Sequence, residues 1–112
     1  MATQERTVEF IIGQLAGVSG ILAGKMFGEY GIWCDGKIVA LICDDQLFVK
    51  PTAPGRELAG GVAEVSPYPG AKPSLLIDPD RWDDADWLVA LIRATADALP
   101  APKPKRSKPK TA

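Results

Sequence analysis

Two stretches near the two ends of the chain repeat their hydrophobic residues with the spacing of an amphipathic helix. The first covers residues 3–16, where Thr3 is placed to cap the helix and Gly17 and Gly20 are placed to end it. Its hydrophobic positions follow the i, i+3, i+4, i+7 pattern of one buried stripe, at Val8, Ile11, Ile12 and Leu15. The pattern predicts an N-terminal helix with one face against a core.

The second such stretch covers about residues 83–99. Either Asp83 or Asp84 can accept hydrogen bonds from the first turn of the helix, and Pro100 ends it. The predicted buried stripe consists of Leu88, Leu91, Ile92, Thr95 and Leu99. The chain is therefore expected to end its folded part in a C-terminal helix.

Between the helices, short apolar runs separated by turn residues predict antiparallel strands. Residues 20–27 form the first strand, and Asp35-Gly36 between the next two runs is the sequence of a type I′ hairpin turn. A two-residue loop fixes the pairing of the flanking strands as Cys34 with Lys37, Ile32 with Val39, and Tyr30 with Leu41. The sequence thus predicts a hairpin with a defined register.

A second turn at Asp44-Asp45 joins strand 37–43 to strand 46–50. Both faces of strand 37–43 are apolar, whereas a strand with one face in water alternates apolar and polar residues. We infer that one face of the sheet meets the helices and that the other meets something else, such as a partner subunit. The pairs predicted across this turn are Leu41 with Phe48 and Ile42 with Leu47.

Residues 51–73 are rich in proline and glycine and are expected to form a loop, with one turn of helix at 56–59. A short strand at 74–78 follows. The order is therefore helix, four strands, loop, strand, helix. It predicts an α+β fold in which an antiparallel sheet of about five strands is flanked by N-terminal and C-terminal helices.

The charges of the chain are divided between two unlike segments. Residues 1–99 hold 8 basic and 14 acidic side chains, a net charge of −6, whereas the whole chain carries −1. Residues 100–112 contain no apolar side chain larger than proline, so this tail is expected to be disordered. Its basic residues are Lys103, Lys105, Arg106, Lys108 and Lys110. They can release counterions from a nucleic-acid backbone without reading its sequence; the alternatives are a solubilising tail or contact with the acidic body of a neighbouring molecule.

The chain lacks histidine, which excludes Ser-His-Asp and Cys-His catalysis and removes the commonest transition-metal ligand. Cys34 and Cys43 are too few for a disulfide scaffold. In the predicted register they point to one face but lie about 20 Å apart, whereas a disulfide tolerates a Cα separation of about 7 Å. We expect both to be buried as small hydrophobic side chains, and we expect no metal and no cofactor.

Five carboxylates crowd the start of the second helix, at Asp78, Asp80, Asp83, Asp84 and Asp86. They do not fit a calcium-binding EF-hand loop, which needs glycine at its sixth position and glutamate at its twelfth. Counted from Asp78, those positions hold Asp83 and Val89. Carboxylates complement the exposed N–H groups of a helix start, so we interpret the cluster as structural.

Three further groups also have a structural interpretation. Residues 55–61 are glycine-rich but lack the Gly-Lys-Ser/Thr ending of a phosphate-binding loop, so a flexible loop is expected. Lys50 and Arg56 offer positive charge for an anion near a strand end, although a lysine there is usually solvated. The tryptophans are not interleaved with basic residues as in a base-stacking platform, so core or interface packing is favoured for Trp33, Trp82 and Trp87.

Taken in order, several of these residues resemble the TfoX N-terminal-domain family over about residues 5–98. The densest part of the resemblance is Met26-Phe27-Gly28, Tyr30-Gly31-Ile32, Asp35-Gly36, Ala40-Leu41, Leu47 and Lys50. The resemblance implies an α+β fold with helices over an antiparallel sheet, similar to small secretion-chaperone-like domains. Members that carry a second domain are linked to the regulation of natural competence, and here the basic tail stands where that domain would begin. The family supplies no catalytic residue to carry over.

We therefore expect a non-enzymatic, TfoX-like regulatory or adaptor protein that acts through protein contacts and is linked to competence or transcription regulation. Residues 1–99 are its expected TfoX N-terminal-like domain, and residues 100–112 are the basic tail. The expected partners are a second copy, in a homodimer, and an unidentified protein. No uncharged apolar run approaches the roughly 20 residues of a membrane span, so a cytoplasmic location without membrane contact is expected. The alternative is an accessory protein that binds nucleic acid nonspecifically through the tail.

Overall fold

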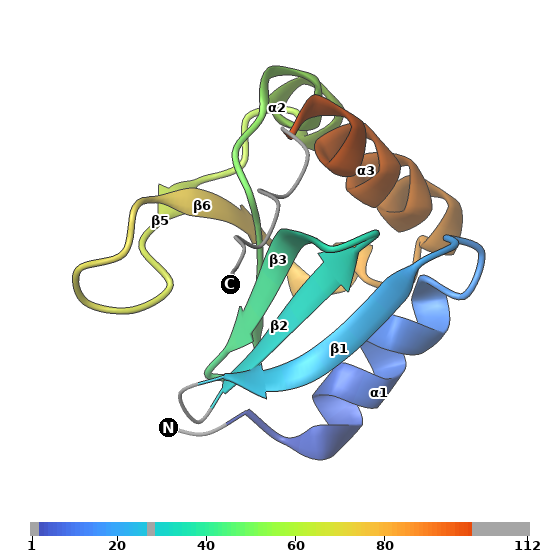
Figure 1. Ribbon diagram of the computed structural model, residues 1–112. Helices are drawn as coiled ribbons and strands as arrows, with labels where there is room; N and C mark the ends of the chain where they lie inside the picture. Colours follow the sequence, from blue (N-terminus) through green and yellow to red (C-terminus); the bar gives the residue numbers. More distant parts are fainter. Residues whose placement is uncertain (1–2, 27–28, 100–112) are drawn as a thin grey trace, which may run out of the picture.

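The computed structural model describes residues 3–26 and 29–99, which form three α-helices, a short 3-10 helix and one six-stranded sheet (Figure 1). In chain order the elements are α1 (Glu5–Gln14), β1 (Ile21–Met26), β2 (Glu29–Cys34), β3 (Lys37–Cys43), β4 (Gln46–Val49), α2 (Ala53–Ala59), β5 (Glu64–Val65), β6 (Ser74–Ile77), the 3-10 helix η1 (Pro79–Arg81) and α3 (Ala85–Ala98). The strands lie in the order β1-β2-β3-β4-β6-β5, and all neighbours are antiparallel. The predicted α+β fold is confirmed, with one strand more than expected because the two-residue β5 pairs with β6.

One face of the sheet packs against α1 and α3 and carries the main core. In Figure 1, α1 lies behind β1 and β2, and α2 runs beside α3. Burying a large aliphatic side chain contributes about 1.5–3 kcal/mol, so this core is the main source of stability. Its side chains exposed by 1% or less include Ile11, Leu15, Ile32, Ile42, Leu47, Leu75, Ile77, Leu88, Leu91 and Ile92. The predicted stripe of α3 is confirmed except at its end, where Ala96 is buried and Leu99 is half-buried.

Both predicted hairpin turns are present. Asp35 and Gly36 have φ values of 51° and 83°, and Asp44 and Asp45 have φ values of 54° and 59°. Positive φ at both central residues defines the type I′ turn, whose twist suits a two-residue hairpin. The pairs predicted across the second turn are confirmed: Leu41 with Phe48 and Ile42 with Leu47.

A β-bulge in β3 changes the register that was predicted for the first hairpin. Val39 is the extra residue, since it falls between two consecutive pairs of the β2–β3 ladder. The observed pairs are Cys34 with Lys37, Trp33 with Ile38, Ile32 with Ala40, Gly31 with Leu41, and Tyr30 with Ile42. Only the first of the predicted pairs is confirmed; the other two, Ile32 with Val39 and Tyr30 with Leu41, are wrong by one residue.

The bulge decides which side chains of β3 face the helices. Side chains alternate along a strand, so one extra residue moves every later side chain to the other face. Ile42 consequently lies in the main core, while Leu41 and Cys43 belong to a second cluster on the opposite face. The prediction that Cys34 and Cys43 share a face is therefore wrong, because Cys34 lies in the main core.

Residues 51–73, predicted as a loop with one turn of helix at 56–59, contain α2, which covers that turn, and β5. Thr52 caps α2 by accepting a hydrogen bond from the Gly55 amide at 3.1 Å, and Gly60 ends the helix with a φ of 73°. A Cβ at Gly55 would lie 3.3 Å from Thr95 Oγ1, so glycine permits the close approach of α2 to α3. The expectation of a flexible loop over residues 55–61 is thus wrong; most of this segment is a capped helix.

The predicted helix caps are partly correct. The side chain of Asp84 accepts a hydrogen bond from the Trp87 amide at 3.1 Å, so Asp84 and not Asp83 caps α3. The N-cap position of α1 is Gln4, whose side chain makes no capping hydrogen bond. Thr3 is therefore not the cap; its hydroxyl contacts the carboxylate of Glu29 on β2 instead.

Candidate functional site

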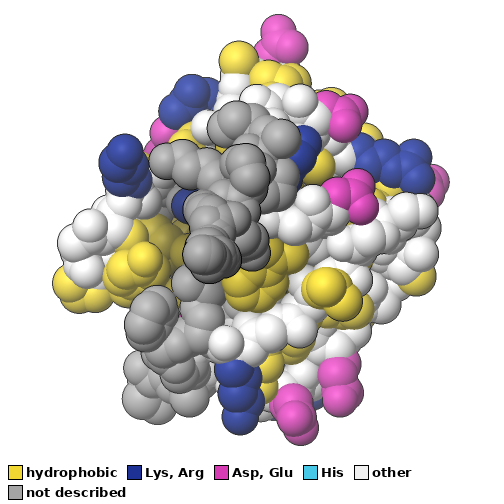
Figure 2. Space-filling model, viewed as in Figure 1, with side chains coloured by type: hydrophobic (Ala, Val, Ile, Leu, Met, Phe, Trp, Pro, Cys, Tyr) yellow, Lys and Arg dark blue, Asp and Glu magenta, His cyan; other side chains and the backbone are white. Residues whose placement is uncertain are grey.

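The face of the sheet opposite α1 and α3, here called the outer face, carries a second apolar cluster. Leu41, Cys43 and Phe48 are buried in it, and the half-buried Ile38 and Leu76 pack against them. All members of this cluster are strand residues, so none of the described helices contributes to it. Figure 2, which views the molecule from this side, shows hydrophobic side chains at the surface over the sheet. The outer face is thus far more apolar than a solvated sheet face requires.

The centre of the outer face is a row of residues that runs across four strands. Gly31 of β2 lies opposite Leu41 of β3, Leu41 opposite Phe48 of β4, and Phe48 opposite Leu76 of β6. Directly opposed side chains of antiparallel strands are the pairs that stabilise a sheet, by about 0.2–1 kcal/mol each. The row therefore exists only because the bulge at Val39 places Leu41 on this side.

The row continues to β1, where it ends at a second glycine. Gly24 of β1 lies opposite Gly31, and neither residue has a side chain to fill the surface. The indole of Trp33 lies next to Gly24, with its Cζ3 atom 3.5 Å from where a Cβ of Gly24 would stand. Beside Trp33, Leu22 is 68% exposed, the most exposed of the large hydrophobic side chains in the described part of the chain.

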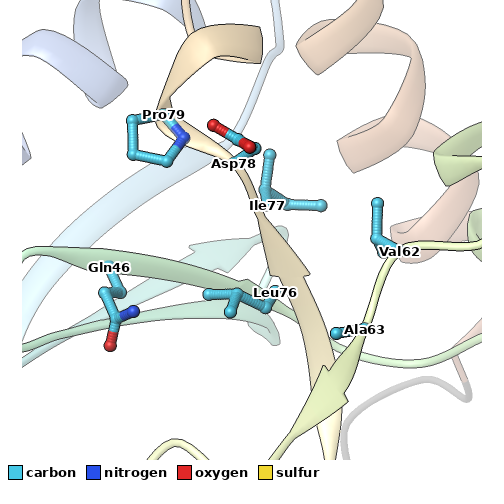
Figure 3. Close-up of a pocket in the computed structure, with 7 residues that line it drawn as sticks. All are labelled: Gln46, Val62, Ala63, Leu76, Ile77, Asp78 and Pro79. Atoms are coloured by element: carbon cyan, nitrogen blue, oxygen red, sulfur yellow. The ribbon is translucent and has the colours of Figure 1, made fainter.

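Two hollows flank the apolar row. One of about 330 Å³ lies at Leu76, and Figure 3 shows this side chain between Gln46 of β4 and Ala63, which precedes β5. The other, of about 370 Å³, is bounded by Leu41 together with the loop between β5 and β6. Leu76 and Leu41, which border the two hollows, belong to the outer-face cluster, so both hollows adjoin it.

Positive charge borders the hollow at Leu41. Lys50 and Lys72 line it beside the half-exposed ring of Tyr68. Across residues 3–26 and 29–99, the ion pair found joins Arg56 to Glu64 at 2.8 Å, and neither lysine takes part in one. Arg56, weighed with Lys50 as an anion-binding residue, is engaged by this bidentate pair, which raises its pKa and lowers that of Glu64.

The two cysteines are free thiols on opposite faces of the sheet. Burial raises the pKa of Cys34, and the neighbouring Asp35 carboxylate adds to the effect. Burial likewise raises the pKa of Cys43, with a further contribution from Glu29. Because the thiolate is the nucleophile, neither side chain is activated at neutral pH. The interpretation of both as buried small side chains is confirmed.

The acidic cluster before α3 serves the backbone. Asp78 accepts a hydrogen bond from the Asp80 amide at 2.9 Å at the start of η1, and Asp84 caps α3. In the part of the chain that the structure describes, no three histidine, cysteine or carboxylate side chains converge as metal ligands, and no helix has the length and apolar character of a bilayer span.

Two of the three tryptophans have structural partners. The indole N–H of Trp87 donates to the Leu58 carbonyl at 3.0 Å, and the Arg81 guanidinium lies 3.7 Å from the centre of its ring. The indole of Trp82 donates to the Ile77 carbonyl at 3.2 Å. Only Trp33 lies on the outer face, so packing was the correct interpretation for the other two.

The structure also shows site residues that no local sequence pattern signals. Tyr68 and Lys72 reach the hollow at Leu41 from a loop about 30 residues away in sequence, so no spacing rule connects them to β3. The predicted nucleic-acid-binding residues lie outside the described residues: Lys103, Lys105, Arg106, Lys108 and Lys110. Phe27 and Gly28, part of the family resemblance, also lie outside them.

Comparison with known proteins adds two findings. Residues 13–99 match the model of the TfoX N-terminal domain family. A relative from Spirochaeta aurantia, described as an uncharacterized 12.7 kDa protein in the trpE 5′ region, is 40% identical over 111 residues. The similarity covers 99% of this chain and 96% of that relative. The β1 edge and the outer face both lie within the matched residues.

Proposed function

The chain belongs to the TfoX N-terminal domain family, and from this premise we propose that it is a non-enzymatic regulatory or adaptor protein that acts through protein contacts. The observation that carries the proposal is the apolar outer face of the sheet. A single small domain needs one hydrophobic core, and here that core lies between the sheet and the helices. The other face carries a second apolar cluster in which Ile38 and Leu76 are half-buried, and Leu22 on the same face is 68% exposed, which supports a binding surface there.

The chemistry of the outer face indicates what kind of protein segment would bind it. The accessible apolar side chains of its centre are the half-buried Ile38 and Leu76. Charge borders both hollows, with Lys50 and Lys72 at the hollow beside Leu41 and Asp78 at the hollow beside Leu76. An apolar segment that carries a carboxylate would match the apolar centre and the two lysines. We therefore propose a protein partner with an acidic, apolar segment, and the regulation of competence or transcription as the setting that the family resemblance suggests.

The test compares two charge variants of the full chain. Lys50→Glu with Lys72→Glu reverses the charge of the hollow, while Lys50→Arg with Lys72→Arg keeps it. Proteins captured from a cell extract by the wild-type chain are purified, and their affinities for all three forms are measured by calorimetry. We expect a partner that binds the wild type and the arginine variant equally and the glutamate variant at least about tenfold more weakly, since charge reversal at an interface costs several kcal/mol. Partners that bind all three forms equally would refute the proposed surface.

A second candidate function rests on the basic composition of residues 103–110, where five of the chain's 13 basic residues lie. In this function the tail binds nucleic acid nonspecifically. Fluorescence anisotropy with labelled duplex and single-stranded DNA would compare the full chain with a variant in which the five residues are glutamine. Binding should weaken steeply between about 50 and 200 mM salt, with a logarithmic slope of at most about 4.5 for five charges. Equal binding by the glutamine variant would refute it.

A further inference from the structure

The two edges of the sheet are unlike. β5 ends one edge with only two residues, whereas β1 ends the other with six residues and no proline. Proteins usually shorten, bend or charge an edge strand, because its unpaired N–H and C=O groups can pair with another chain. β1 carries a single charged side chain, Lys25, and no described strand lies beyond it.

Alternation along β1 identifies the backbone groups that are free to pair. The Gly20 carbonyl accepts a hydrogen bond from the Asp35 amide at 3.1 Å, so the ladder with β2 begins at Gly20. In an antiparallel ladder every second residue points its N–H and C=O to the neighbour. Ile21, Ala23 and Lys25 therefore direct these groups away from β2, along the open edge.

We propose that two copies of the chain pair antiparallel along β1, about a twofold axis at Ala23. Ala23 then faces Ala23 of the second copy, and Ile21 faces Lys25 of the second copy, so all three outward-directed residues form hydrogen-bonded pairs. This inference rests on the homodimer expected from the sequence and identifies its interface. It leaves the outer faces of both copies open to a further partner.

The side chains are complementary in this register. Leu22 falls opposite Gly24 of the second copy, so the exposed leucine meets a residue without a side chain, next to the indole of Trp33. Each Lys25 lies opposite an isoleucine, which keeps the two like charges apart. Residues 1–99 carry a net charge of −6, but β1 contains no carboxylate. The β1 edge is thus a place where two acidic molecules can meet without opposed carboxylates.

Pairing along β1 would join two six-stranded sheets into one continuous sheet. Leu22 and Trp33 of both copies would then form the centre of the combined outer face. A partner that binds the outer face could contact both copies at once.

Cysteine cross-linking of the full chain tests this register. Ala23→Cys places two thiols on residues whose Cα atoms are about 5.5 Å apart across the axis, within the reach of a disulfide. Lys25→Cys, on the same side of the same strand, places them four residue steps apart, about 13 Å, which is beyond that reach. Both native cysteines are buried, so the wild-type chain is the background control. We expect mild oxidation to cross-link the Ala23→Cys chains and to leave Lys25→Cys and the wild type uncross-linked.

The mass of the wild type, measured in parallel by sedimentation, separates the possible failures. A dimer in which Lys25→Cys cross-links and Ala23→Cys does not would overturn the register while the homodimer stands. A dimer in which neither variant cross-links would place the interface elsewhere. A monomer at about 1 mM would overturn the homodimer and this interface together, and the binding of another protein to the outer face would still be decided by the lysine variants.

Discussion

At the scale of single residues, two carboxylates tie the beginning of the chain to the hairpin turns. Glu29 Oε1 accepts hydrogen bonds from the amide and hydroxyl of Thr3 and from the Asp44 amide. Asp45 Oδ1 accepts from the Gln4 amide at 2.8 Å and from the Thr7 hydroxyl at 2.9 Å. The bonds to Thr3, Gln4 and Thr7 anchor the start of α1 to residues more than 25 positions away in the sequence.

The role of Asp45 predicts a pH dependence of stability. Hydrogen bonds from the Gln4 amide and the Thr7 hydroxyl hold the pKa of Asp45 below its ordinary value. A carboxyl whose pKa is lowered by folding stabilises the protein above its unfolded pKa, near 4, and loses this contribution as the pH falls through the lower, folded value. Asp45→Asn keeps the hydrogen-bond acceptor and a residue that tolerates positive φ but removes the charge.

Urea unfolding at pH 7 and pH 3 checks this expectation. The free energy of unfolding of the wild type should fall more between the two pH values than that of Asp45→Asn. An equal fall in the free energy of unfolding in both proteins would show that the charge of Asp45 does not stabilise the fold.

At the scale of the elements, the sequence predicted strands and turns well and faces poorly. Asp35-Gly36 and Asp44-Asp45 identified both hairpin turns, because positive φ at two successive positions restricts the residues that can stand there. The bulge at Val39 was missed, because residues 38–43 are all apolar and give no alternation from which a face could be read. Only the second half of α2 was predicted, as one turn at 56–59, because a seven-residue helix that begins Ala-Pro-Gly resembles a loop in composition.

Two changes at Val39 test its assignment as the extra residue of the bulge in β3. Val39→Ala removes part of a fully buried side chain and should lower the free energy of unfolding by about 2–3 kcal/mol. Deletion of Val39 removes the same buried side chain and the bulge, but it leaves Ala40, Leu41 and Ile42 opposite Ile32, Gly31 and Tyr30, so the two faces of β3 are kept. We expect the deletion variant still to unfold cooperatively, as followed by circular dichroism, with a loss of stability at least as large as that of Val39→Ala. A deletion variant that no longer unfolds cooperatively would contradict the assignment of Val39 as the extra residue.

The start of α3 offers a matched pair of cap variants. Asp84→Ala removes the acceptor for the Trp87 amide and should destabilise the protein by about 1 kcal/mol. Asp83→Ala, one residue earlier on an exposed side chain, should change stability by less than about 0.5 kcal/mol. Thermal or urea unfolding measures both. A larger effect at Asp83 would contradict the assignment of the cap.

At the scale of the whole molecule, the chain has two layers: the helices cover one face of the sheet, and the other face carries the second apolar cluster. The sequence predicted this asymmetry from the two apolar faces of strand 37–43. It could not predict the hollow at Leu41, because Lys50, Tyr68 and Lys72 come together only through the fold. It also could not show that the most exposed large hydrophobic side chain of the described residues, Leu22, lies on an open strand edge beside a glycine.

Sedimentation equilibrium of three full-length proteins tests most directly whether the chain works through contacts of its sheet. Leu22→Glu places a charge on the exposed leucine of the β1 edge, and Val65→Glu does the same on the opposite edge, where Val65 is 41% exposed. We expect the wild type and Val65→Glu to be dimers with equal affinity and Leu22→Glu to dissociate at least about tenfold more readily, since each opposed edge pair would lose an apolar contact and gain a buried charge. A wild-type monomer, or three proteins with the same mass at every concentration, would contradict the proposed interface.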